Sequence, residues 1–112
     1  MPPDPRTYLW DARRAAQQIQ VFIESRTWDD YSTDALLRSA VERQFEIVGE
    51  ALNKLRHADE ALSQQVPDIA RIVAFRNLLI HGYTSIDDRL VWDTATGRVA
   101  PLIGNLTDLL SE

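Results

Sequence analysis

The chain has 112 residues, of which 45% are hydrophobic and 26% charged, and its formal net charge is −5. These proportions are typical of a globular chain and argue against disorder, and the length predicts a single helical domain over residues 1–112. The chain contains no cysteine, which excludes disulfides, thiolate catalysis and cysteine-based zinc sites. The negative charge argues against a broad basic nucleic-acid surface, although it still allows a small local anion site.

The sequence shows no sign of secretion or membrane insertion. Residues Met1–Arg6 lack the apolar segment of a signal peptide. The chain also lacks a run of about 18 apolar residues, the length needed to span a bilayer. Because the absence of cysteine also fits a reducing compartment, we expect a cytoplasmic protein.

Hydrophobic periodicity predicts helices along the whole chain, and no strand pattern competes with them. We expect a first helix over about 8–25, a loop over 27–32 and a second helix over 34–57. The first helix should bury one stripe, formed by Tyr8, Ala12, Ala15, Ile19 and Phe22. The second carries the strongest signal, because one apolar face continues along its whole length. That face consists of Leu37, Val41, Phe45, Val48, Leu52 and Leu55.

The second half of the chain predicts three further helical segments. A short helix is expected around 60–65 and a third main helix from 68 to about 80, ending at Gly82. A last helical region over 87–110 should be kinked or broken by Pro101. The fold class expected is therefore all-α: an up-and-down bundle of four main helices plus a short helix.

Three glutamates on the second helix follow one another at intervals of four residues, Glu42, Glu46 and Glu50. Two interpretations remain open. They form either a solvated face that pairs with Arg43 and Lys54, or a face that binds a partner.

The third helix departs from its own pattern at Arg76. Ile69, Val73 and Ile80 mark its buried stripe, and Arg76 falls on that stripe, where an apolar residue is expected. Burying a guanidinium without a partner is costly. Either Arg76 lies at the edge of the stripe, extending its charged end to water or pairing with a glutamate of the second helix, or it serves a functional site.

His81 follows in the last turn of this helix, about 140° around it from Arg76 if the helix stays regular. Positive charge is favoured at a helix C-terminus, so a protonated His81 would suit a general acid or a phosphate contact. His81 could equally be an ordinary C-terminal residue, as we expect for His57. Tyr83 alone would be read as a packed aromatic. The clustering of Arg76, Asn77, His81 and Tyr83 within eight residues is what favours a functional site.

The run Arg76-Asn77-x-x-x-His81-x-Tyr83 resembles the signature of HEPN toxins of the HepT type. The segment Ala40–Ala51 on the second helix is similar to the other recurring segment of this family, and Val91-Trp92 and the leucine-rich tail after Pro101 also fit. The resemblance covers essentially the whole chain. An Arg-x-x-x-x-His spacing alone would be weak evidence for this family, because it occurs by chance in many helices.

The resemblance implies a HEPN-like fold and a metal-independent endoribonuclease that acts as a homodimer. Arg76 and His81 would be the catalytic residues, with Asn77 as a supporting polar residue, and the motifs of two subunits would face each other in a cleft. No cofactor is expected, and the product would end in a 2′,3′-cyclic phosphate. Asp87-Asp88 and the lone His81 do not form a plausible two-metal site.

The resemblance also implies a partner, a minimal nucleotidyltransferase antitoxin of the MntA type, in a type VII-like toxin–antitoxin module. The partner would add AMP to Tyr83, and the added bulk and negative charge would block RNA. Two other interpretations stay open. The chain could be a non-catalytic HEPN-like module that binds a nucleotide or the partner enzyme, or a plain dimerisation bundle.

Overall fold

The structure is a computed structural model that describes residues 3–82 and 84–111. This part of the chain forms seven helices and no strand, which confirms the all-α prediction. The helices are α1 (Pro5–Ile23), α2 (Trp28–Thr33), α3 (Ala35–Ala58), α4 (Glu60–Ser63), α5 (Ile69–His81), α6 (Asp88–Gly97) and α7 (Val99–Leu110). None of these helices is both long and apolar enough to cross a membrane.

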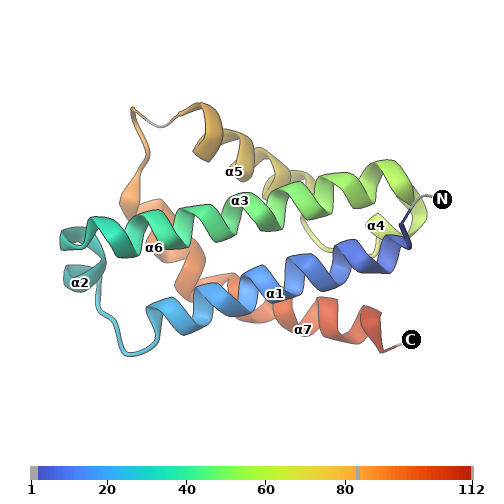
Figure 1. The fold of residues 1–112 in the computed structure, drawn as a ribbon, viewed down its shortest axis with the longest axis horizontal. Helices are drawn as coiled ribbons and strands as arrows, with labels where there is room; N and C mark the ends of the chain where they lie inside the picture. Colours follow the sequence, from blue (N-terminus) through green and yellow to red (C-terminus); the bar gives the residue numbers. More distant parts are fainter. Residues whose placement is uncertain (1–2, 83, 112) are drawn as a thin grey trace.

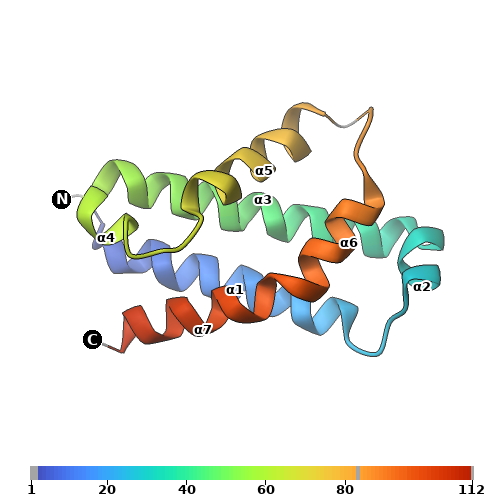
Figure 2. The same cartoon turned by 180° about the vertical axis from the view of Figure 1, so that it is seen from behind.

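The long elements form an up-and-down bundle (Figure 1). α1 and α3 run antiparallel along the length of the molecule, α5 turns back across α3, and α6 and α7 return together toward the end where the chain begins. α3 packs against both α1 and α5, and α7 packs against α1. Seen from behind, α5, α6 and α7 cover the other side of the α1–α3 pair (Figure 2). The C-terminal end of α5 tilts away from α3 in both views.

The hydrophobic core follows the predicted stripes of α1 and α3 closely, whereas α5 buries Val73 and Leu79 and leaves Ile69 and Ile80 of its predicted stripe half-buried. All six residues of the predicted apolar face of α3 are buried. In α1 the buried stripe is rotated slightly from the prediction, because Leu9 is buried while Tyr8 and Phe22 are only half-buried. The remaining buried positions of α1 are Ala12, Ala15, Ala16 and Ile19.

The prediction of a loop over 27–32 is wrong, because α2 lies there. Thr27 and Asp30 form a capping box: Asp30 N–H donates to Thr27 Oγ1 at 3.2 Å, and Thr27 N–H donates to Asp30 Oδ2 at 2.8 Å. Tyr31 anchors the helix because its side chain is fully buried. Asp34 caps α3, since it accepts a hydrogen bond from Leu37 N–H at 3.1 Å.

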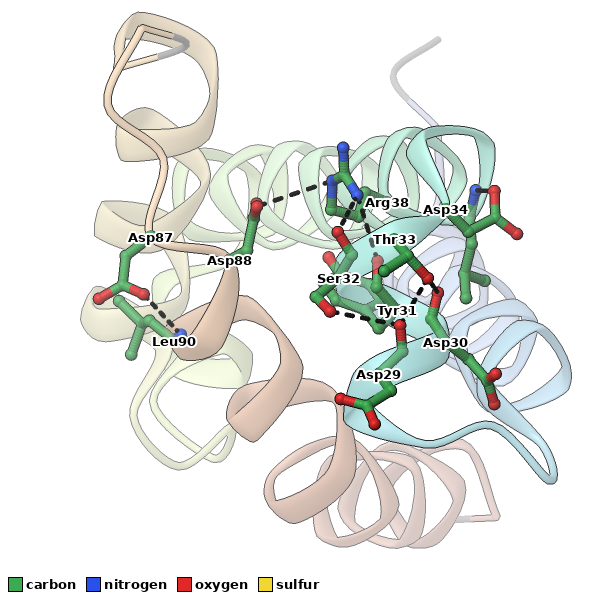
Figure 3. Close-up of polar contacts among 11 residues, drawn as sticks. Asp29, Asp30, Tyr31, Ser32, Thr33, Asp34, Arg38, Asp87, Asp88 and Leu90 are labelled. Atoms are coloured by element: carbon green, nitrogen blue, oxygen red, sulfur yellow. Dashed lines mark hydrogen bonds and ion pairs between the residues drawn. The ribbon is translucent and has the colours of Figure 1, made fainter.

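Arg38 joins α2, α3 and α6 (Figure 3). Its Nη1 donates to the carbonyls of Tyr31 and Ser32 at 3.3 and 2.7 Å, and its Nε lies 3.6 Å from Asp88 Oδ2. A cation at the C-terminus of α2 and an acid in the first turn of α6 both suit the helix dipoles. Asp87 caps α6. Both aspartates therefore fix where the chain re-enters the bundle after α5.

The predicted break in the last helical region occurs at Arg98 rather than at Pro101. α6 ends at Gly97, and α7 begins at Val99. Pro101 lies in the first turn of α7, where the missing N–H would have no partner within the helix. The proline is therefore accommodated in a regular helix, and the chain bends before it.

Candidate functional site on helix α5

The site begins where α5 crosses α3. Gly49 of α3 is buried, and a Cβ built on it would lie 2.2 Å from Cβ and 2.6 Å from Cγ of Arg76. Real atoms never approach so closely, so the crossing requires a residue without a side chain at this position. Phe45 and Phe75 pack edge to face at the same crossing, with ring centroids 5.1 Å apart. The base of the Arg76 side chain is thereby fixed against α3.

The guanidinium of Arg76 emerges from this contact and meets two neighbours. Nη1 donates to Asn77 Oδ1 at 2.8 Å, and Nη2 lies 3.5 Å from Glu50 Oε1. The other oxygen of Glu50 lies 4.0 Å from Arg43 Nη1, and the same nitrogen lies 3.6 Å from Glu46 Oε1. Arg76 thus pairs with a glutamate of α3, which is one of the two structural explanations given for its place on the buried stripe. Two of the three glutamates spaced along α3, Glu46 and Glu50, also pair with Arg43.

Arg76 also keeps an unused donor. Its side chain is 23% exposed, and its Nε is buried without a hydrogen-bond partner among the residues that the structure describes. A buried donor without an acceptor costs about 1–3 kcal/mol. A phosphate oxygen cannot reach this buried nitrogen, but the exposed part of the Arg76 side chain offers it a pre-positioned, partly desolvated cation.

His81 is the last residue of α5 and is exposed. The helix ends as predicted, with Gly82 N–H donating to Leu78 O at 2.8 Å. Gly82 has a φ of −100°, so it does not adopt the left-handed conformation common at helix ends. The glycine is required for space instead, because a Cβ there would lie 2.7 Å from Leu78 O.

The structure places Arg76 and His81 on one regular helix but on different sides of it. Five residues correspond to about 7.5 Å along the axis and about 140° around it. Arg76 faces α3, whereas His81 lies at the end of α5 that tilts away from the bundle (Figure 1). Neither a hydrogen bond nor an ion pair joins the two in the described part of the chain. Tyr83, the predicted modification site, lies outside the described residues.

The remaining polar candidates have structural roles. His57 is exposed in the last turn of α3, as expected for an ordinary C-terminal histidine. Asp87 and Asp88 are occupied by the cap of α6 and by Arg38. Over residues 3–82 and 84–111, no three histidine, aspartate or glutamate side chains are grouped so that they could hold a metal ion.

Glu42 lies in an unfavourable electrostatic environment between α3 and α6. Burial raises the pKa of its carboxyl group, Asp88 raises it further, and Arg38 opposes part of that rise. Burial likewise raises the pKa of the Tyr31 phenol, with Glu42 adding to the effect. The first of the three glutamates therefore belongs to the α2–α3–α6 junction rather than to the Arg76 cluster.

Comparison with known proteins places the whole chain in one family. The family model described as "Ribonuclease HepT-like" matches residues 12–108. A Thermococcus cleftensis protein named "Probable ribonuclease HepT" is 30% identical over 106 residues, which cover 93% of this chain and 94% of that protein. A Methanocaldococcus jannaschii protein named as a candidate RNase is 29% identical over 111 residues, covering 97% of this chain and 89% of its own.

A third relative, from Caldanaerobacter subterraneus and also named as a candidate RNase, is 26% identical over 108 residues, which cover 96% of each chain. No solved structure matches the chain. The family match extends from α1 into α7 and includes the α3–α5 crossing and the Arg76–His81 run. The chain therefore belongs to the HepT-like ribonuclease family.

Proposed function

We propose that the protein is an endoribonuclease toxin that cleaves RNA without a metal ion, at a composite site formed by Arg76 and His81 of two copies of the chain. The observation that carries this proposal is the state of Arg76. Its guanidinium is held in place by Glu50 and Asn77, and its side chain stays 23% exposed. It lies within the motif that the sequence shares with HEPN toxins.

The reaction requires no group beyond the RNA and the side chains. The 2′-hydroxyl of one nucleotide attacks the adjacent phosphorus, and a base accepts its proton. The bond from phosphorus to the 5′ oxygen of the next nucleotide then breaks, and an acid protonates that oxygen. The products are a 2′,3′-cyclic phosphate and a free 5′-hydroxyl, and a cation stabilises the charge that builds up on the phosphorane.

Arg76 and His81 divide these roles between them. Arg76 is the cation, since it is fixed in place before substrate binds and loses little freedom on binding phosphate. His81 transfers protons and is accessible because it is exposed. One chain supplies a single His81, whereas the reaction needs a proton acceptor and a proton donor. A two-fold homodimer supplies two histidines and two arginines.

The outer face of α5 supports a dimer of this kind. Ala70, Ala74, Asn77, Leu78 and His81 are all exposed, and each lies three or four residues from another of the set on this helix. Leu78 is 48% exposed, and the two alanines leave room for another helix to approach closely. An α5–α5 contact would bring both His81 side chains near one axis.

Regulation would act at Tyr83. In this proposal a partner nucleotidyltransferase adds AMP to the Tyr83 hydroxyl, as in a type VII-like toxin–antitoxin pair. The phosphate would introduce negative charge two residues from His81. RNA phosphate would then be excluded by bulk and by like-charge repulsion.

End-group analysis tests the chemistry. The purified chain should cleave a 5′-labelled oligoribonucleotide in EDTA and leave a 2′,3′-cyclic phosphate. The same oligonucleotide with 2′-O-methyl groups should resist, because its nucleophile is blocked. Loss of cleavage in EDTA, or cleavage of the methylated RNA, would contradict the mechanism. Binding of RNA without any cleavage would favour the non-catalytic module.

A further inference from the structure

A groove of about 500 Å³ lies between α1 and α3, which run side by side in Figure 1. Its volume falls in the range of small-ligand sites. α1 contributes Trp10 and Arg14 to the lining, and α3 contributes Ile47, Glu50 and Lys54. None of these residues belongs to the motif on α5.

The groove presents an aromatic platform. Trp10 is 45% exposed, and the guanidinium carbon of Arg14 lies 5.5 Å from the centre of its ring. Single-stranded nucleic acids are commonly bound by stacking bases on aromatic rings and on arginine planes.

Glu50 connects the groove to the candidate site. It lines the groove, and its Oε1 lies 3.5 Å from Arg76 Nη2. Since α3 is only about 10 Å wide, a strand whose phosphate meets Arg76 can cross α3 and reach the groove. Glu50 does not strongly repel such a strand, because Arg76 and Arg43 both face its carboxylate.

We infer that the α1–α3 groove binds an unpaired base of the RNA substrate, stacked on the Trp10–Arg14 pair, while Arg76 binds a neighbouring phosphate. This inference rests on the proposed function, which supplies the RNA. Arg14 and Lys54 lie on either side of the groove, and their charges balance those of Asp11 and Glu50 in the lining, on a chain whose net charge is −5. The groove thereby extends the substrate site beyond the scissile phosphate and favours single-stranded RNA.

The lining argues against a second copy of the chain as the occupant. Besides Arg14, Glu50 and Lys54, the groove contains Asp11 and the amides of Gln18 and Gln44, so six of its eleven lining residues are polar or charged. The centres of subunit interfaces are depleted in charged residues. Amides and a carboxylate suit hydrogen bonds to base edges instead.

The test compares two substrates and three variants. One substrate is a dinucleotide that contains only the scissile phosphate, and the other is an oligoribonucleotide of about six nucleotides, within the usual size of single-strand sites. The variants are Trp10→Ala, Arg14→Gln and the control Arg89→Gln. Arg89 also lies over a tryptophan, 4.9 Å from the ring centre of Trp28, but outside the groove.

Trp10→Ala should raise KM for the longer RNA about tenfold, within the range that one base stack supplies, and kcat should change little. Arg14→Gln should have a smaller effect in the same direction, and Arg89→Gln none. With the dinucleotide, the rise in KM should be much smaller for both groove variants. A 2′-O-methyl form of the longer RNA should quench the fluorescence of the chain, and Trp10→Ala should remove that quenching.

Three results separate the possible failures. If both groove variants cleave the longer RNA like the wild type and the methylated RNA causes no quenching, the inference is wrong. If Trp10→Ala turns a dimer into a monomer, the groove is a subunit interface and the inference is again overturned. If the wild type cleaves neither substrate, the proposed function fails, while quenching by the methylated RNA still decides whether the groove binds RNA.

Discussion

The backbone of Gly49 on α3 lies directly against the side chain of Arg76 on α5. A Cβ on Gly49 would lie 2.2 Å from Arg76 Cβ, and the next residue, Glu50, pairs with the Arg76 guanidinium at 3.5 Å. Two consecutive residues of α3 therefore determine both where Arg76 lies and where its charge points. The precision of the candidate site depends on this crossing as much as on the motif itself.

Gly49→Ala should damage both stability and activity. The added methyl group has no space at the crossing, so α5 must shift, at a cost of about 1–3 kcal/mol. Urea denaturation should show a lower midpoint, and RNA cleavage should fall at least about tenfold, because the Arg76 guanidinium moves with the helix.

Gly104→Ala is the matched control for that change. Gly104 lies within α7, and a Cβ added there meets no atom within 4 Å. Alanine is favoured over glycine in a helix by about 1 kcal/mol, so the free energy of unfolding should stay the same or rise, and cleavage should not change. A Gly49→Ala protein as stable and active as the control would refute the role given to the crossing.

Glu42→Gln should stabilise the fold at neutral pH. The pKa of Glu42 is raised in the folded chain, chiefly by burial, so its ionised form destabilises the native state above that pKa. The penalty is relieved as the pH falls through the folded pKa toward the unfolded value. The denaturation midpoint of Glu42→Gln should therefore exceed the wild type at pH 7 and approach it near pH 4.

Exposed Glu24 at the end of α1 provides the comparison. Glu24→Gln removes the same charge from a solvated position and should change the midpoint little at either pH. If Glu42→Gln were less stable than the wild type at pH 7, the electrostatic attraction of Arg38 for Glu42 would outweigh the cost of burial.

Leu78→Glu should separate the proposed homodimer. Leu78 is 48% exposed on the outer face of α5, and a charge there would lie in the expected α5–α5 contact. Sedimentation should show twice the 12.8 kDa chain mass for the wild type and a single mass for the variant, with cleavage lost in parallel. Leu36→Glu, at an 81% exposed leucine on α3, should remain dimeric. A wild-type monomer that cleaves RNA would rule out a composite site.

Modification by the partner enzyme should occur on Tyr83. Incubation with the nucleotidyltransferase, ATP and a divalent ion should add the mass of AMP to the wild type and to Tyr8→Phe, but not to Tyr83→Phe. Tyr31 offers no accessible hydroxyl, because it is fully buried. The modified protein should lose RNA cleavage. Peptide mapping that located AMP on another residue would assign control to a different site.

The long amphipathic helices could be predicted from the sequence because each buries one continuous stripe. α3 is the clearest case, since every residue of its predicted face is buried. α2 escaped prediction because six residues are too few to show a period. Thr27 and Asp30 form the capping box of α2. The Thr27-x-x-Asp30 spacing was the signal that could have identified it.

The motif residues could also be named as candidates from the sequence, but the residues that hold Arg76 in place could not be predicted from it. Arg76 broke the stripe of its helix and was a candidate for that reason. Nothing in the periodicity of α5 indicates that Gly49 faces it, because that contact joins residues distant in the chain. The only local indication of this contact is that Gly49 is a glycine inside a strongly helical segment. The groove beside Trp10 depends on how α1 and α3 pack, which no single helix reveals.

RNA cleavage by Arg76→Ala and His81→Ala, measured beside His57→Ala, shows whether the α5 motif is catalytic. His57 and His81 are both exposed in the last turn of a helix, so His57→Ala controls for the loss of a surface histidine. Each motif variant should keep its helical circular dichroism and lose at least about a hundredfold in cleavage rate, whereas His57→Ala should match the wild type. Asn77→Ala should lose less of the cleavage rate, because Asn77 is a supporting residue. Wild-type cleavage by folded His81→Ala or Arg76→Ala would contradict the account.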